Sequence, residues 1–211
     1  RLPEDVWKSW VDILAGYPLV MADDKHTDAV LVERAYKHAR GELIRALVVR
    51  VSRVQKSEDQ SILRRRIGYC WDADMKDALL KTVGGEGATQ EAVELAFSIL
   101  IENDCAEAYS IAETVLNSSE PSSDSAKALI AGKTLLCYGE DRGWSTVWPV
   151  MKASPQLGCR LLEETLCSSD HRRLPWEGSL SERQLGEFYR WLLRQYPPQE
   201  YALPLGAHYS G

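Results

Sequence analysis

Apolar side chains recur at steps of three and four residues along almost the whole chain, and this period constrains the fold more than any other feature. Such spacing places side chains on one face of an α-helix. No segment alternates between apolar and polar residues as a half-buried strand does, so we predict an all-α protein without a sheet. The longest apolar stripe comprises Val32, Tyr36, Ala39, Leu43, Leu47, Val51 and Val54.

Caps and stop signals divide this pattern into short helices. Gly41 is predicted to kink or divide the long segment at 28–56, and Asp104 with Glu107 has the spacing of a capping box, as does Ser181 with Gln184. The predicted helices lie at 3–15 and 28–56, from Asp72 to Gly84, from Thr89 past Ile101, from Asp104 to Leu116, around 129–136, on both sides of Ser154, and from Ser181 past Leu193.

The segment at 143–149, GWSTVWP, predicts a helix hairpin. Trp144 and Trp148 are four positions apart and share a helix face, where we expect them to belong to the core rather than to a partner surface. Ser154 and Pro155 then supply an N-cap and a first helical residue for the next helix.

Short helices joined by tight turns cannot each bury an apolar face alone, and stacking them produces a continuous core. We therefore predict stacked antiparallel helix hairpins in a HEAT-like or armadillo-like α-solenoid, with residues 1–211 as a single repeat-like domain. No clean repeat period is visible, which leaves a compact irregular helical bundle as the alternative fold.

Composition narrows the class of protein. A net charge of -6 argues against a protein that coats nucleic acid, and no apolar run is long enough to cross a membrane. The five cysteines include no CxxC pair, which favours free thiols in a reducing cytoplasm. The chain begins without Met, and we expect it to be a fragment of a larger multidomain protein.

The sequence contains no motif of a known catalyst. The glycine-rich stretch at 84–89 lacks the lysine of a phosphate-binding loop and is better interpreted as a helix end followed by a turn. The four histidines show no metal-binding spacing, and no serine lies in a GxSxG motif. We therefore expect no catalytic residue, cofactor site or metal site in this chain.

Charge is distributed unevenly. Residues 34–66 hold ten basic side chains against three acidic ones, a net charge of +7, whereas residues 72–124 hold two basic and twelve acidic ones, a net charge of -10. The basic segment fits a nucleic-acid surface, a plain solvated face, or one side of a stack that faces acidic neighbours. Arg50 falls close to the apolar stripe, where it either pairs with a buried carboxylate or marks a helix break.

Residues 168–180 form the longest irregular stretch of the chain. This stretch contains Arg172, Arg173 and Trp176, which are residue types favoured at interaction hot spots. We predict that these three residues contact a neighbouring domain of the same polypeptide or a trigger protein. The alternative is a packed connector between two hairpins.

Two segments together carry a family resemblance. The first runs from Ala131 to Leu166 and contains GWSTVWP and Leu157-Gly158; the second contains LSERQL at 180–185, FYRWLLRQYPP at 188–198 and Gly206-Ala207-His208. Residues 131–211 resemble the helical region downstream of the nucleotide-binding domain in bacterial NACHT-type STAND NTPases. Only Glu200 remains of the acidic residues that this family pattern has after Tyr-Pro-Pro.

The resemblance implies a sensor or regulatory segment of a signalling ATPase, among whose relatives some act in defence against phage. The NTPase module would then lie outside these residues. The competing hypothesis is a free-standing helical adaptor that binds protein or RNA through the basic segment 34–66.

Overall fold

A computed structural model describes residues 3–16, 25–54, 57–85, 87–118, 126–168 and 180–197. The described residues form eleven α-helices and no strand, which confirms the predicted all-α class. The helices are α1 (Glu4–Gly16), α2 (Lys25–His38), α3 (Arg40–Val51), α4 (Ser57–Tyr69), α5 (Ala73–Gly84), α6 (Gln90–Glu102), α7 (Ala106–Leu116), α8 (Ala126–Tyr138), α9 (Glu140–Ala153), α10 (Pro155–Ser168) and α11 (Glu182–Gln195).

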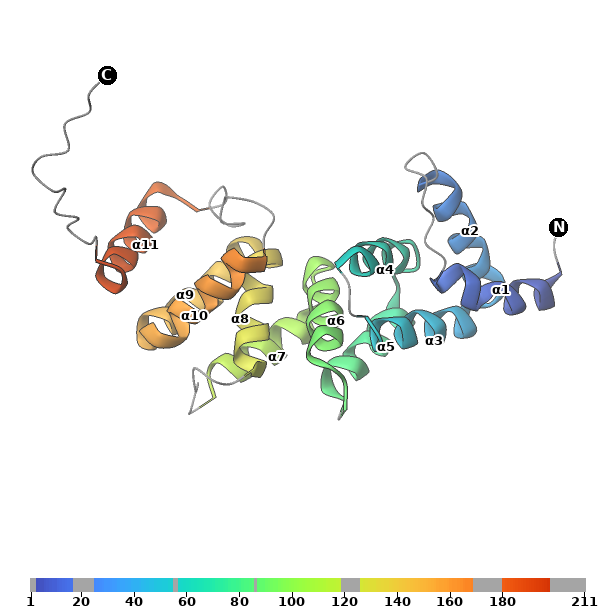
Figure 1. Ribbon diagram of the computed structural model, residues 1–211, viewed down its shortest axis with the longest axis horizontal. Helices are drawn as coiled ribbons and strands as arrows, with labels where there is room; N and C mark the ends of the chain where they lie inside the picture. The colour runs from blue at the N-terminus through green and yellow to red at the C-terminus, as the bar shows by residue number, and fades with distance from the viewer. Residues whose placement is uncertain are drawn as a thin grey trace, which may run out of the picture.

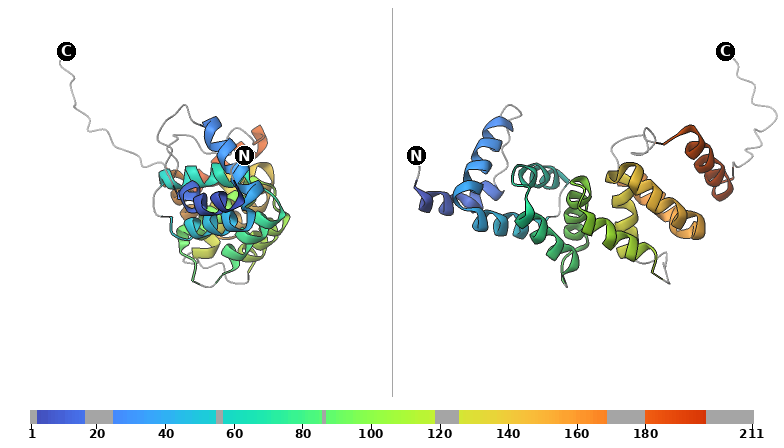
Figure 2. Two further views of the ribbon diagram at one scale, coloured as in Figure 1. Left: turned by 90° about the vertical axis from the view of Figure 1, so that its right-hand side faces the viewer. Right: turned by 180° about the vertical axis from the view of Figure 1, so that it is seen from behind.

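The helices follow one another along a single long axis. Helices α1 and α2 lie at one end of the molecule and α11 lies at the other (Figure 1). Seen along this axis, the helices overlap within a compact outline (Figure 2). Extensive packing joins only helices that are at most three places apart in chain order. The core is therefore a continuous column, to which each helix contributes locally.

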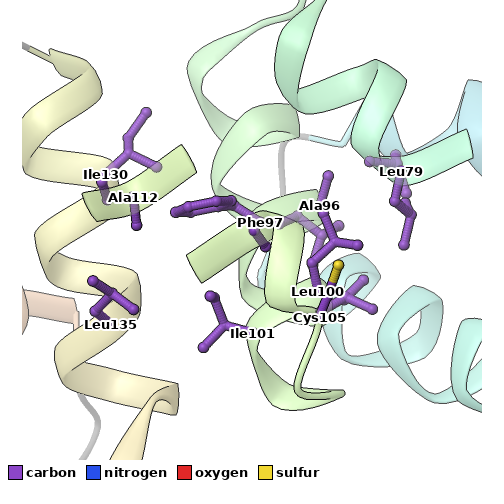
Figure 3. Packing of buried hydrophobic residues seen from close by; sticks show 14 of the residues in the cluster. Leu79, Ala96, Phe97, Leu100, Ile101, Cys105, Ala112, Ile130 and Leu135 are labelled. Atoms are coloured by element: carbon purple, nitrogen blue, oxygen red, sulfur yellow. The ribbon is translucent and has the colours of Figure 1, made fainter. Parts of the chain in front are cut away.

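Helix α6 lies at the centre of this column. Eight residues of α6 are buried, and they lie on all sides of the helix. This pattern is expected for a helix that other helices surround. Figure 3 shows Phe97 pointing toward Ala112 of α7 and Ile130 of α8, while Leu100 lies on the side of Leu79 of α5. The two halves of the molecule thus share one hydrophobic cluster through α6.

Among the described residues, three turns of the column consist of a single residue: Ala39, Gly139 and Ser154. The chain leaves the helical conformation only at Ala39 between α2 and α3, so the predicted division of the 28–56 segment occurs two residues before Gly41. Gly139 alone separates α8 from α9. A Cβ atom at Gly143 would lie 2.0 Å from the carbonyl oxygen of Leu135, so only glycine permits this crossing of α8 and α9.

The proposed capping box at Asp104 is wrong. Asp104 has a φ of 52° and closes α6: the amide of Cys105 donates to the carbonyl of Leu100, and the amide of Asp104 donates to that of Ile101. These two bonds form a Schellman motif, in which the residue after the cap adopts the left-handed conformation. Helix α7 begins after Cys105, which makes no side-chain capping bond.

Other predicted caps are confirmed. The side chains of Asp72 and Thr89 accept amide hydrogen bonds at the starts of α5 and α6, and Ser181 with Gln184 forms a complete capping box. Gly84 ends α5, so the glycine-rich stretch is a helix end and a turn.

On α1 the predicted apolar face is only partly correct, because Trp10 and Ile13 are exposed whereas Val11 is buried.

Ion pairs join each helix from α2 to α7 to the helix two places further along the chain, with N···O distances between 2.5 and 3.9 Å. We call this series the ion-pair ladder. Its members are Asp28 with Arg65 and Arg66 (α2–α4), Arg40 with Asp72 and Asp74 (α3–α5), Arg64 with Glu102 (α4–α6), Lys76 with Glu107 (α5–α7), Glu94 with Lys133 (α6–α8), and Glu113 with Arg142 (α7–α9).

The ladder explains much of the uneven charge in the sequence. Arginines of the basic segment at positions 40 and 64 pair with carboxylates of the acidic segment, as expected for a stack in which basic and acidic segments face each other. The buried arginine is Arg66, which donates to Asp28 at 3.1 Å, rather than Arg50. Arg50 lies within α3 without a helix break, and its guanidinium packs against Gly16 at the end of α1.

Candidate protein-recognition groove

Helix α9 places its two tryptophans in the core, as the sequence predicted. Trp144 is 1% exposed and Trp148 is 7% exposed. Their rings stack with centroids 5.0 Å apart and an interplanar angle of 15°. This spacing follows from the four-residue interval, which brings the second ring one helical turn above the first.

Helix α11 completes an aromatic cluster by laying two rings against these tryptophans. Phe188 meets Trp144 edge-on with centroids 5.7 Å apart, and Trp191 meets Trp148 edge-on at 5.9 Å. Offset and edge-on aromatic pairs of this kind stabilise a contact by about 0.5–1.5 kcal/mol beyond the area that they bury. The aromatic cluster is defined here as Trp144, Trp148, Phe188 and Trp191.

Gly158 of α10 makes room for this cluster. A Cβ atom at position 158 would lie 2.9 Å from Cζ2 of Trp191 and 3.2 Å from Cβ of Met151. The indole of Trp191 therefore lies directly against the backbone of α10, and it is only 8% exposed. The Leu157-Gly158 dipeptide of the sequence resemblance is explained by this contact: Leu157 is buried, and Gly158 receives the ring.

A groove lies over the aromatic cluster between α9 and α11. Its volume is about 460 Å³, within the usual range for ligand pockets. Two tryptophans contribute to its lining together with four charged side chains, and the Nζ atom of Lys152 lies 5.4 Å from the ring centroid of Trp148. The groove is lined by Trp148, Lys152, Glu187, Arg190, Trp191 and Arg194.

The charges of the groove are unbalanced. Glu187, its one carboxylate, accepts from Nε of Arg183 at 3.2 Å, and Arg183 lies outside the groove. Arg190 uses its Nε atom for the backbone carbonyl of Gly186 at 3.0 Å. Within the part of the chain that the structure describes, no carboxylate pairs with Lys152, Arg190 or Arg194. Three cations therefore surround an aromatic floor.

Two polar groups of the floor also lack partners. The indole nitrogens of Trp148 and Trp191 are buried and donate to no acceptor among the described residues. Buried donors of this kind normally find an acceptor, because leaving one unsatisfied costs about 1–3 kcal/mol. Both nitrogens lie within the aromatic cluster and do not reach the surface of the groove, so the cations alone offer it polar groups without described partners.

The opposite flank of α11 is apolar and exposed. Tyr189 and Leu193 are exposed there, and Tyr196 follows one turn later. The hydroxyl of Tyr196 donates to the carboxylate of Glu163 on α10 at 3.0 Å, which fixes the end of α11 against α10. Burial and this hydrogen bond raise the pKa of Tyr196 above its ordinary value. Helix α11 therefore presents cations on one flank and the exposed side chains of Tyr189 and Leu193 on another.

The structure does not test the residues predicted as a partner-binding site. Arg172, Arg173 and Trp176 fall in 169–179, outside the described residues, so their contacts remain a prediction. The structure resumes at Leu180, which is buried and precedes the capping box of α11. Sequence reasoning placed Trp148 correctly in the core but gave no signal for the groove, because the groove depends on α9 and α11 lying side by side.

Across the described ranges, no three His, Cys, Asp or Glu side chains gather in a way that would hold a metal ion. In the same residues, no helix has both the length and the apolar character to cross a bilayer. The cysteines at 70, 105, 137 and 159 are free thiols, and burial raises the pKa of Cys70 to about 12.

Comparisons with known proteins give no family assignment. No protein-family model, no curated protein and no solved structure matches this chain.

Proposed function

We propose that this chain is a non-enzymatic recognition scaffold, a HEAT-like or armadillo-like α-solenoid that serves as the sensor or regulatory segment of a NACHT-type STAND NTPase. The observation that carries the proposal is the groove between α9 and α11, which combines an aromatic floor with cations that lack partners. Aromatic and arginine side chains are the residue types that dominate protein-recognition hot spots.

The arrangement of the helices supports the same proposal. Packing between near neighbours and a ladder of ion pairs from α2 to α9 give an elongated column, which is the architecture that solenoid proteins use to present extended surfaces. The free thiols fit a cytoplasmic protein. The proposed partners are a neighbouring domain of the same polypeptide, held in an autoinhibited state, or a trigger protein in bacterial signalling or antiphage defence.

The competing proposal is a free-standing adaptor that binds protein or RNA through the basic segment 34–66. The ladder weighs against its RNA form, because Arg40, Arg64, Arg65 and Arg66 are all engaged with carboxylates. Exposed cations of that segment still include Arg34 and Lys37.

The test is made in the polypeptide that the gene encodes. We expect a GxxxxGK[ST] loop upstream of residue 1, and we expect ATP hydrolysis by that polypeptide to be regulated through this segment. Deleting residues 1–211 should raise basal hydrolysis or abolish its response to the trigger. Replacing Arg172, Arg173 and Trp176 together by Ala tests the predicted contact of the 168–180 stretch. A reading frame without an NTPase module would contradict the proposal and favour the adaptor.

A further inference from the structure

The cations of the groove differ from the cations of the ion-pair ladder. Each helix from α2 to α7 is connected to the helix two places further on by an ion pair. The next such joint in this odd-numbered series is α9–α11, and no ion pair among the described residues crosses it. Instead, Lys152 on α9 and Arg190 and Arg194 on α11 line the groove from its two sides.

The groove at this joint therefore contains three cations that no carboxylate of the described residues pairs with. Three like charges on one groove repel one another, and opposite charges from a ligand would relieve that repulsion. Glu187 balances only one of the three cations, and its carboxylate also accepts from Nε of Arg183, which lies outside the groove. The missing component is a set of carboxylates.

The floor of the groove adds an apolar requirement. Trp148 and Trp191 line it, and their rings meet edge-on at a centroid distance of 5.9 Å. An aromatic or aliphatic side chain bound over these rings would bury apolar surface between the flanking cations. A ligand that fits both features carries carboxylates on either side of one bulky apolar residue.

Resting on the proposed role in protein recognition, we propose that this groove binds an acidic peptide segment of a protein partner. Carboxylates of the segment pair with Arg190, Arg194 and Lys152, and one bulky apolar side chain lies over Trp148 and Trp191. Guanidinium groups suit this role because their planar donors match the two oxygens of a carboxylate. Nucleic acid fits less well, because three cations neutralise few phosphates and the chain as a whole carries a charge of -6.

Fluorescence polarisation with the 211-residue chain tests the inference. The probe is a fluorescein-labelled octapeptide of Asp and Glu with a central Trp and Leu, and the reference peptide replaces every Asp by Asn and every Glu by Gln. We expect the acidic probe to bind with a dissociation constant on the order of 10–100 μM at low salt and to weaken as salt is added. The neutral peptide should bind at least about tenfold more weakly.

A matched pair of variants locates the site. The triple change Lys152→Gln, Arg190→Gln and Arg194→Gln should weaken binding of the probe by about thirtyfold or more, because it removes all three cations. The control triple Arg34→Gln, Lys37→Gln and Arg45→Gln removes the same charge from an exposed face of α2 and α3 and should change binding by less than about threefold. The single change Arg183→Gln frees Glu187 into the groove and should weaken binding by a smaller factor.

Three outcomes would overturn the inference: equal binding of the neutral peptide, equal losses in both triple variants, or tighter binding of a single-stranded oligonucleotide of the same charge. If the groove triple fails to fold, as judged by circular dichroism, the single variant Arg190→Gln takes its place. Failure of the peptide to bind, with regulation of ATP hydrolysis intact in the full polypeptide, overturns this inference and leaves the proposed function standing.

Discussion

The joints between α2 and α9 and the joint between α9 and α11 are built differently. In the first region each helix is connected to the second helix after it by an ion pair, and one of these pairs, Asp28 with Arg66, is buried. In the second region aromatic rings make the contact, and the cations face an open groove. Ion pairs fix the register of two helices, whereas edge-on aromatic rings stabilise the contact and leave charge available for a ligand.

Removing Trp148 should have the largest effect, because no ion pair among the described residues supports the aromatic joint. We expect Trp148→Ala to lower the free energy of unfolding by ~3–5 kcal/mol, since it leaves a large cavity next to Trp144 and Trp191. Urea denaturation measures this loss. Trp10→Ala is the control, because Trp10 is exposed and its loss should cost less than about 1 kcal/mol. Equal losses of unfolding free energy in the two variants would show that Trp148 contributes no more to stability than an exposed tryptophan does.

The buried end of the ladder should come next. Asp28→Ala leaves the guanidinium of Arg66 buried without its carboxylate, which should cost about 3–4 kcal/mol. The exposed pair of Arg45 with Glu42 is the control, and Arg45→Gln should change stability by less than about 0.5 kcal/mol. Chemical denaturation separates the two. A small effect of Asp28→Ala would mean that water or another group solvates Arg66.

A smaller effect is expected at Gly158, where the aromatic joint meets α10. In Gly158→Ala the new methyl group displaces Trp191, which should cost about 1–2 kcal/mol after the gain in helix propensity. Gly68→Ala is the control, because no atom lies within 4 Å of a Cβ built there, and it should stabilise the protein by about 0.5–1 kcal/mol. Stabilisation by both changes would place Trp191 away from α10.

The exposed pair of Lys76 with Glu107 should show the smallest effect, visible only in its pH dependence. The hydrogen bond from Lys76 lowers the pKa of Glu107 from 4.5 to about 2. Its contribution is fully present above the unfolded pKa and is lost as the pH falls through the folded pKa.

Lys76→Met should therefore differ from wild type in unfolding free energy at neutral pH, and the difference should vanish as the pH falls from about 4.5 to about 2. Acid titration of thermal stability measures it. Lys81→Met, which removes an exposed cation from the same helix, should show no such convergence. Parallel curves for the wild type and Lys76→Met would contradict the pairing.

The sequence predicted the helices best where the signals were local. Asp72, Thr89 and Ser181 act through bonds to amides two or three residues away, so their roles are readable from the chain alone. Helix α4 was missed because its sequence, SEDQSILRRRIGY, has few apolar residues and three consecutive arginines. Its burial depends on Asp28 of a helix that is distant in sequence.

The same limit applies to the groove. Trp148 was assigned to the core by its spacing from Trp144, and this assignment is confirmed. The role of Lys152, Arg190 and Arg194 was not predicted, because their proximity arises only when α11 packs on α9. Asp104 was misinterpreted for a different reason: a left-handed residue that ends one helix has the same sequence spacing as a cap that begins the next.

The restriction of packing to helices close in chain order has a kinetic consequence. Contacts of low sequence separation form with little loop-closure entropy, so the column should fold rapidly and can nucleate at more than one place. Unfolding should then proceed from the ends of the column. Helix α11 should be among the first segments to exchange its amide protons for deuterium. Its described contacts with α9 and α10 are aromatic rings and the one hydrogen bond to Glu163. Any molecule that occupies the groove would slow that exchange in α11 before it slowed exchange in α6.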